Sequence, residues 1–113
     1  MAKFFSDEET KGLVPELVEK LDRARELCGF PFVITSGFRT PEENERIGGA
    51  KESSHLKGMA ADIRRPLDVD LVFRMCWAAG LAGFRRIEIC DRHIHLDVDA
   101  EKTQDIMWFG KSR

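Results

Sequence analysis

The chain has 113 residues and a mass of 12.9 kDa, which is enough for one domain, residues 1–113, with a single hydrophobic core. Its formal net charge of −2 provides no basic field for a phosphate backbone, so nucleic acid is not an expected partner. No apolar run approaches the roughly 20 residues of a membrane span and no secretory signal is recognisable, so we expect a cytoplasmic protein at synthesis, and a monomer.

Helical and strand signals alternate in the first half of the chain. A proline that suits a first helical turn, apolar residues at helical spacing and a final Gly29 predict a helix over residues 14–28. The β-branched and aromatic segment 31–36 predicts a buried strand. Thr40, followed by a proline, is a candidate N-cap for a second, short helix.

The next segment carries a histidine on a loop. Residues 50–58 show no apolar period and predict a loop that delivers His55. Residues 59–63 predict a strand, which Pro66 prevents from extending. A third helix is expected to start at residue 68 or 70 and to end at residue 80 or 83.

The C-terminal part predicts a β-hairpin. Residues 84–90 and 93–98 look like strands joined by a tight turn at Asp91-Arg92, and the apolar residues 107–109 are expected to cover one end of the core. The element order is helix, strand, helix, strand, helix, strand, strand. It predicts an α+β fold with a small, mainly antiparallel sheet flanked by helices.

Two short motifs hold all three histidines of the chain. Residues 53–62 read Ser-Ser-His-Leu-Lys-Gly-Met-Ala-Ala-Asp, and residues 93–97 read His-Ile-His-Leu-Asp. Two imidazoles and a carboxylate match the three N/O ligands of a catalytic zinc site, which leaves one position for water. Gly58 must allow a turn if His55 and Asp62 are to reach the same ion.

Strand parity groups the remaining polar residues of the second motif. His93 and His95 are two residues apart, so both project from one face, and one can bind the metal while the other stands near the reacting centre. Asp97 and Asp99 share this parity. We expect Asp97 to orient a ligand and Asp99 to be solvated.

These motifs resemble those of the M15 zinc peptidases, a family of D-alanyl-D-alanine carboxypeptidases, D-Ala-D-Ala dipeptidases and phage endolysins that cleave L-alanyl-D-glutamate. The pattern Ser-x-His-x-x-Gly-x-Ala-x-Asp matches residues 53–62, and the Ser-Gly-Phe-Arg segment 36–39 is similar to the family's Ser-Gly-Tyr-Arg. The terminal His-Ile-His also resembles the hedgehog signalling domain, which shares the fold and the zinc triad. The resemblance covers about residues 30–99.

The resemblance implies roles for five side chains. Zinc would be held by His55, Asp62 and His95. Arg39 would meet the carboxylate or polarised carbonyl of the substrate, and Ser53 would hydrogen-bond near the site. For Arg39, a surface ion pair with a neighbouring glutamate is the alternative.

The sequence offers three candidates for the catalytic base. Most M15 enzymes carry an acid a few residues before the last histidine, whereas this chain has Arg92 three residues before it. Asp91 is the preferred candidate because a bulge at the hairpin could turn it inward. Glu88 and His93 are the alternatives, and His93 could instead stabilise an oxyanion.

The resemblance therefore implies a zinc-dependent peptidase that hydrolyses bonds in peptidoglycan stem peptides, as a DD-carboxypeptidase or an L-Ala-D-Glu endopeptidase. It would act on the cell wall if it is a phage-type lysin. The missing acid before His95 motivates an alternative of another class, a catalytically silent, zinc-stabilised module that binds peptide or protein.

Overall fold

Two long helices form where the sequence predicts them. In the computed structural model, which describes residues 2–112, α1 spans Pro15–Cys28 and α3 spans Val69–Ala82. Each ends at a glycine in the left-handed region, Gly29 at φ 86° and Gly83 at φ 105°, where a residue with a Cβ atom would be strained. The short α2, Pro41–Arg46, starts at Thr40, whose hydroxyl oxygen accepts the Glu43 N–H at 3.2 Å. No helix among residues 2–112 is long and apolar enough to cross a membrane.

One sheet of five strands organises the molecule, in the order β1-β2-β4-β3-β5. All neighbours are antiparallel except β3 and β5, which run parallel. This confirms the α+β, mainly antiparallel prediction. The strands are β1 (Ile34–Ser36), β2 (Ala60–Arg64), β3 (Arg86–Ile89), β4 (His93–Asp97) and β5 (Ile106–Phe109).

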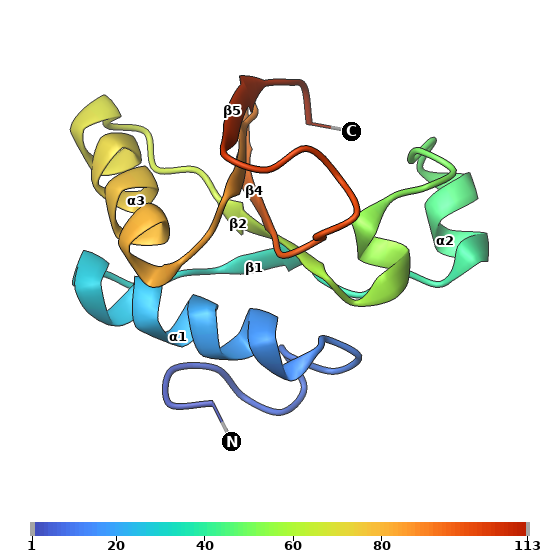
Figure 1. The fold of residues 1–113 in the computed structure, drawn as a ribbon, viewed down its shortest axis with the longest axis horizontal. Helices are drawn as coiled ribbons and strands as arrows, with labels where there is room; N and C mark the ends of the chain where they lie inside the picture. The colour runs from blue at the N-terminus through green and yellow to red at the C-terminus, as the bar shows by residue number, and fades with distance from the viewer. Residues whose placement is uncertain (1, 113) are drawn as a thin grey trace.

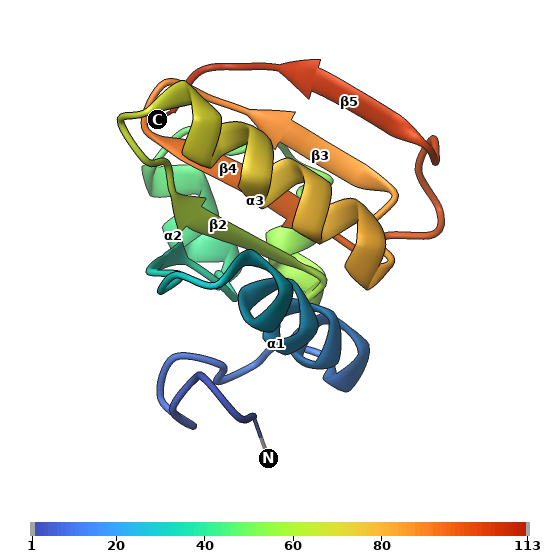
Figure 2. The ribbon, with the colours of Figure 1, turned by 90° about the vertical axis from the view of Figure 1, so that its left-hand side faces the viewer.

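The two faces of the sheet have different roles (Figures 1 and 2). Helices α1 and α3 pack against each other and against one face, while α2 and the short 3₁₀ helix η1 (Ser54–Lys57) lie on the other side. In β4, Ile94 and Leu96 are buried in the core beneath the helices, whereas the alternate residues face the opposite side. Period-two alternation therefore separates the core from a polar face that is free to carry chemistry.

The tail of the chain differs from the prediction. Residues 107–109 do not cover the end of the core: they belong to β5, an edge strand in which Met107 is 52% and Phe109 is 80% exposed. Four consecutive apolar residues carry no alternation, so the sequence could not distinguish a core cap from a strand. The predicted hairpin is confirmed, because β3 and β4 pair antiparallel on either side of Asp91-Arg92.

Candidate metal centre

The pairing of β2 with β4 brings the two histidine motifs together. Asp62 lies directly opposite His95 in the antiparallel register, and His93 lies opposite Arg64. His55 comes from η1, which ends at Gly58 in the left-handed region, φ 70°. A Cβ atom on Gly58 would also overlap the carbonyl oxygen of Gly12, so this turn needs glycine for two reasons.

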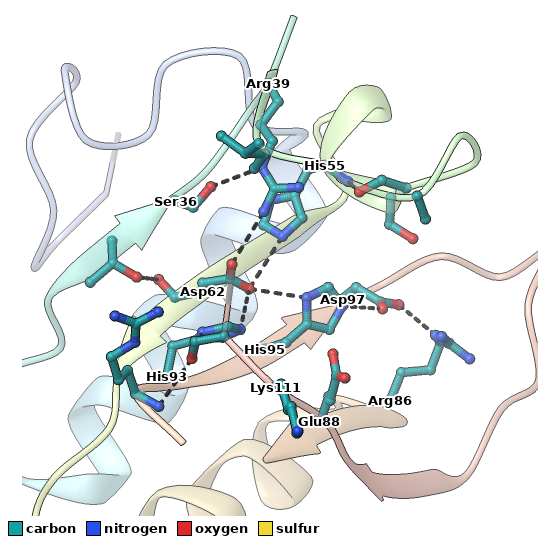
Figure 3. Close-up of a pocket in the computed structure, with 18 of the residues that line it drawn as sticks. Ser36, Arg39, His55, Asp62, Arg86, Glu88, His93, His95, Asp97 and Lys111 are labelled. Carbon is teal, nitrogen blue, oxygen red and sulfur yellow. Dashed lines mark hydrogen bonds and ion pairs between the residues drawn. The ribbon is translucent and has the colours of Figure 1, made fainter. Parts of the chain in front are cut away.

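All three histidines converge on the carboxylate of Asp62 (Figure 3). Its Oδ1 lies 3.2 Å from His55 Nε2, 3.1 Å from His95 Nδ1 and 3.6 Å from His93 Nε2. One ligand atom each of His55, Asp62 and His95 lies within 4.8 Å of the other two. The three residues expected to share a metal ion are therefore adjacent.

Outer hydrogen bonds fix which nitrogen each imidazole presents to Asp62. His55 Nδ1 lies 2.7 Å from the carbonyl oxygen of Gly37, which can only accept, so Nδ1 carries a proton and Nε2 is the nitrogen that faces Asp62. His95 Nε2 lies 2.7 Å from Asp97 Oδ2, so its Nδ1 faces the site. Hydrogen-bond acceptors in these positions orient metal-binding histidines and raise their basicity. Asp97 orients His95 in this way, as expected from the sequence.

The centre is electrostatically built for a cation. Burial alone would raise the pKa of the Asp62 carboxyl, but hydrogen bonds from His55 and His95 hold that pKa far below its ordinary value. Burial alone would lower the pKa of His95, but Asp62 and Asp97 raise that pKa to about 9. In the metal-free protein the protonated His95 ring donates one N–H to each of the two carboxylates, and a divalent cation beside Asp62 would take the place of the Nδ1 proton.

Arg86 and Trp108, which the sequence did not reveal as site residues, support Asp97. Arg86 Nε donates to Asp97 Oδ1 at 2.8 Å and its Nη1 donates to the Thr103 carbonyl at 2.6 Å. The guanidinium lies 4.9 Å from the ring centroid of Trp108, which itself lies 6.1 Å from that of His95. Trp108 reaches the site because β5 pairs with β3 and places it beside Glu88, and no motif in the sequence signals that pairing.

Asp99 is not solvated as predicted, because it is fully buried. Its carboxylate accepts the hydroxyl of Ser54 at 2.8 Å and pairs with Lys57 Nζ at 2.7 Å. Burial alone would raise the pKa of Asp99, but Lys57 and Ser54 hold that pKa below its ordinary value. This carboxylate joins the end of β4 to η1 and so fixes the turn that carries His55.

Arg39 points into the site. Its side chain is 11% exposed, and Nη2 lies 3.4 Å from Asp62 Oδ2, which does not fit a surface ion pair. Ser36 Oγ accepts its Nε–H at 3.1 Å, and Asn44 Oδ1 accepts its Nη1–H at 3.1 Å. The hydroxyl oxygen of Ser53 accepts the backbone N–H of His55 at 3.2 Å, so Ser53 caps η1 at the rim of the site.

The centre lies in an open cleft of about 870 Å³ on the side of the sheet opposite α1 and α3. Glu88 and His93 line this cleft, whereas the Asp91 side chain is 63% exposed on the hairpin and accepts the Ser112 N–H at 2.6 Å. Six basic side chains line the cleft against three acidic ones, in a protein whose net charge is −2. The basic residues are Arg39, Arg64, Arg86, Arg92, Lys102 and Lys111.

Comparison with known proteins agrees with this geometry. A family model described as Peptidase M15 matches residues 3–97. The chain belongs to the peptidase M15 family. The crystal structure of Serratia marcescens L-Ala D-Glu endopeptidase ChiX is similar to this M15 protein, with a TM-score of 0.65 and 21% sequence identity over 89% of this chain and 90% of that chain. No curated protein sequence matches the chain.

The donor set of this M15 protein fits zinc. Two imidazole nitrogens and one carboxylate oxygen are the ligand types of catalytic zinc sites, and no thiolate is among them. The outer nitrogen of each imidazole donates to Gly37 or Asp97, so the inward nitrogen is the one that would offer its lone pair to a metal ion. Among residues 2–112, every buried side-chain nitrogen or oxygen atom has a hydrogen-bond partner, so the cluster is a preformed unit.

Proposed function

We propose that the protein is a zinc-dependent peptidase that hydrolyses peptide bonds in peptidoglycan stem peptides, of the DD-carboxypeptidase or L-Ala-D-Glu endopeptidase type. The observation that carries the proposal is the His55, Asp62 and His95 cluster, whose outer hydrogen bonds direct one lone pair of each imidazole toward an open cleft. Membership of the M15 family supports peptide hydrolysis. Because ChiX is an L-Ala D-Glu endopeptidase, the L-Ala-D-Glu bond is the first one to test.

In this proposal His55, Asp62 and His95 hold the metal. A zinc ion held there would supply Lewis acidity, which polarises a carbonyl group and lowers the pKa of a water molecule. Asp97 keeps the Nε2 proton of His95 and so keeps Nδ1 available. Arg39 and the other basic groups of the cleft fit a substrate with free carboxylates, such as a stem peptide, and Ser53 lies at the same rim.

Glu88 replaces Asp91 as our candidate for the catalytic base. It pairs with His95 across β3 and β4, so its side chain shares the face of the metal centre, and Figure 3 shows it projecting into the cleft. Burial and the Glu88 charge raise the pKa of the Cys90 thiol to about 12, so the thiol stays protonated beside this carboxylate. Glu88 would accept the proton that the attacking water loses and return it to the leaving amine.

His93 is our candidate for stabilising the oxyanion. Its Nδ1 lies 2.7 Å from the hydroxyl of Ser112, and its Nε2 lies 3.6 Å from Asp62 Oδ1 at the edge of the centre. With the Ser112 hydroxyl donating to Nδ1, Nε2 carries a proton that can be donated to a developing negative charge. The Ser112 hydrogen bond also holds the ring at a fixed angle, as this role needs.

The deciding experiment is the incubation of purified protein with muropeptides, with and without a chelator, followed by mass analysis of the fragments. We expect cleavage that the chelator abolishes and zinc restores. Glu88→Gln should keep its zinc and lose turnover by roughly 10²-fold or more, while Asp91→Asn, its matched control on the hairpin, should stay active. A protein that retains zinc and cleaves no stem peptide would instead support the silent binding module.

A further inference from the structure

Helix α3 carries large apolar residues on both its buried and its exposed side. One side is buried against α1 and the sheet through Val72, Met75, Ala78, Ala79 and Ala82. The opposite side exposes four large apolar residues: Val69 at 75%, Phe73 at 71%, Trp77 at 49% and Leu81 at 55%. Leu67, just before the helix, is 100% exposed. An ordinary surface helix is polar on its outer side, so this one resembles a helix made for burial on both sides.

The spacing of the four exposed residues is regular. Val69, Phe73, Trp77 and Leu81 are four residues apart, so they form one continuous ridge of the kind that packs into the groove of another helix. We call these four residues the α3 ridge. Gly80 lies beside it with open space around its Cα, which leaves a shallow place where a side chain of another helix can sit.

The ridge is also symmetric about residue 75. If two copies of α3 pack antiparallel around a two-fold axis at that position, Val69 of one copy meets Leu81 of the other. Phe73 then meets Trp77, and each of these contacts occurs twice. A surface that matches itself in this way is what a two-fold interface requires, since the same patch must serve both partners. Ridges of this four-residue class pack at about −50° to each other.

The exposed area is large for a protein of this size. With 150–250 Å² for each aromatic side chain and somewhat less for each aliphatic one, the ridge and Leu67 expose roughly 600 Å² of apolar surface. That is at the upper limit for the largest apolar patch of a monomer and approaches the roughly 800 Å² that each partner contributes to a standard interface.

We propose that the protein forms a symmetric dimer with a second copy of itself through the α3 ridge. The sequence-based expectation of a monomer did not take this outer side into account. Because α3 and the cleft lie on opposite faces of the sheet, dimerisation leaves both clefts open and facing away from each other. If the proposed function holds, one dimer would engage two peptides of the same polymeric wall, which raises its effective affinity without a new contact.

The first test is sedimentation velocity over a range of protein concentrations. The native protein should be dimeric with a dissociation constant of roughly micromolar or tighter. Phe73→Lys should weaken association by about 100-fold or more, because the substitution acts twice across the axis. Phe109→Lys is the matched control, since Phe109 is a phenylalanine of similar exposure, 80% against 71% for Phe73, on the β5 edge.

The second test uses the two-fold pairing itself. Phe73→Glu and Trp77→Lys should each be monomeric alone, but their mixture should form a heterodimer. In that heterodimer Glu faces Lys in one contact and Trp faces Phe in the other.

A native protein that stays monomeric at high concentration would overturn the proposal. So would a dimer that Phe109→Lys disrupts and Phe73→Lys does not, or an equimolar mixture that remains monomeric. Muropeptide cleavage by the Phe73 variants tests the enzyme separately, because the ridge lies outside the cleft.

Discussion

Asp97→Asn is the most informative single substitution, because Asp97 serves both the metal centre and the fold. Its Oδ2 accepts the Nε2–H of His95 and its Oδ1 accepts Arg86 Nε–H and the Asp99 backbone N–H. An asparagine keeps the shape but loses the charge, and its NH₂ group must face either His95 or Arg86. If it faces His95, Nε2 becomes an acceptor and the proton moves to Nδ1, the nitrogen that would bind the proposed zinc ion.

The magnitudes follow from burial. Removal of a partner that orients a metal-binding histidine costs 10–100-fold in metal affinity. Arg86 and Asp97 are 11% and 1% exposed, so breaking this pair should also destabilise the protein by about 3 kcal/mol, the low end for a buried pair because the amide oxygen can still accept one hydrogen bond. For a domain of this size that corresponds to a melting temperature lower by roughly 10–20 °C.

The assay separates the two effects. Zinc affinity is measured by competition with a chelating indicator, and stability by urea unfolding of the metal-free protein. The double variant Arg86→Met/Asp97→Asn removes both charges, so it should recover stability but not zinc affinity. An Asp97→Asn protein with zinc affinity within threefold of the native value would refute the assigned role of Asp97, and a double variant no more stable than the single one would refute the ion-pair account.

Three further outcomes are expected. Asp62→Ala leaves two imidazoles and should lose zinc while the metal-free protein still folds; a zinc-replete variant by elemental analysis would contradict this assignment. Gly110→Ala introduces a Cβ atom that overlaps Glu88 Oε2, so it should displace this flexible carboxylate and lower turnover with little change in melting temperature, whereas unchanged turnover would argue against Glu88 as the base. The lowered pKa of Asp99 means that this group stabilises the fold above its unfolded pKa of about 3.9 and that the contribution is lost as the pH falls toward the folded pKa. The stability difference between the native protein and Asp99→Asn should therefore be largest near neutral pH and shrink below about pH 4, and a difference that does not vary with pH in urea unfolding would be inconsistent with an ionised Asp99.

Local rules predicted most of this fold, and long-range register explains the rest. Pro15 and Gly29 bound α1 through interactions within a few residues, which a sequence displays directly. The parallel pairing of β5 with β3 joins segments about twenty residues apart, and no local pattern encodes it. Trp108, which reaches the site only through that pairing, could not be foreseen.

The same distinction applies to the individual side chains of the site. Strand parity correctly put Asp97 and Asp99 on the side of His95, but parity does not determine burial. Asp99 is covered because Lys57 and Ser54, on another element, fold onto it. Likewise the choice between Glu88 and Asp91 depends on the register of β3 against β4, which pairs Glu88 with His95 and leaves Asp91 in the exposed turn.

The basic side chains that line the cleft affect the rate at which a peptide associates with the protein, rather than the chemical step. Six cationic side chains gathered in a concave surface concentrate the field of a protein that is otherwise slightly acidic, so a negatively charged peptide is attracted before it makes contact. Such steering acts over about 10 Å at 0.1 M salt and shrinks as the ionic strength rises. Association with an anionic stem peptide should therefore slow steeply with added salt, while association with the same peptide amidated at its carboxylates should hardly change.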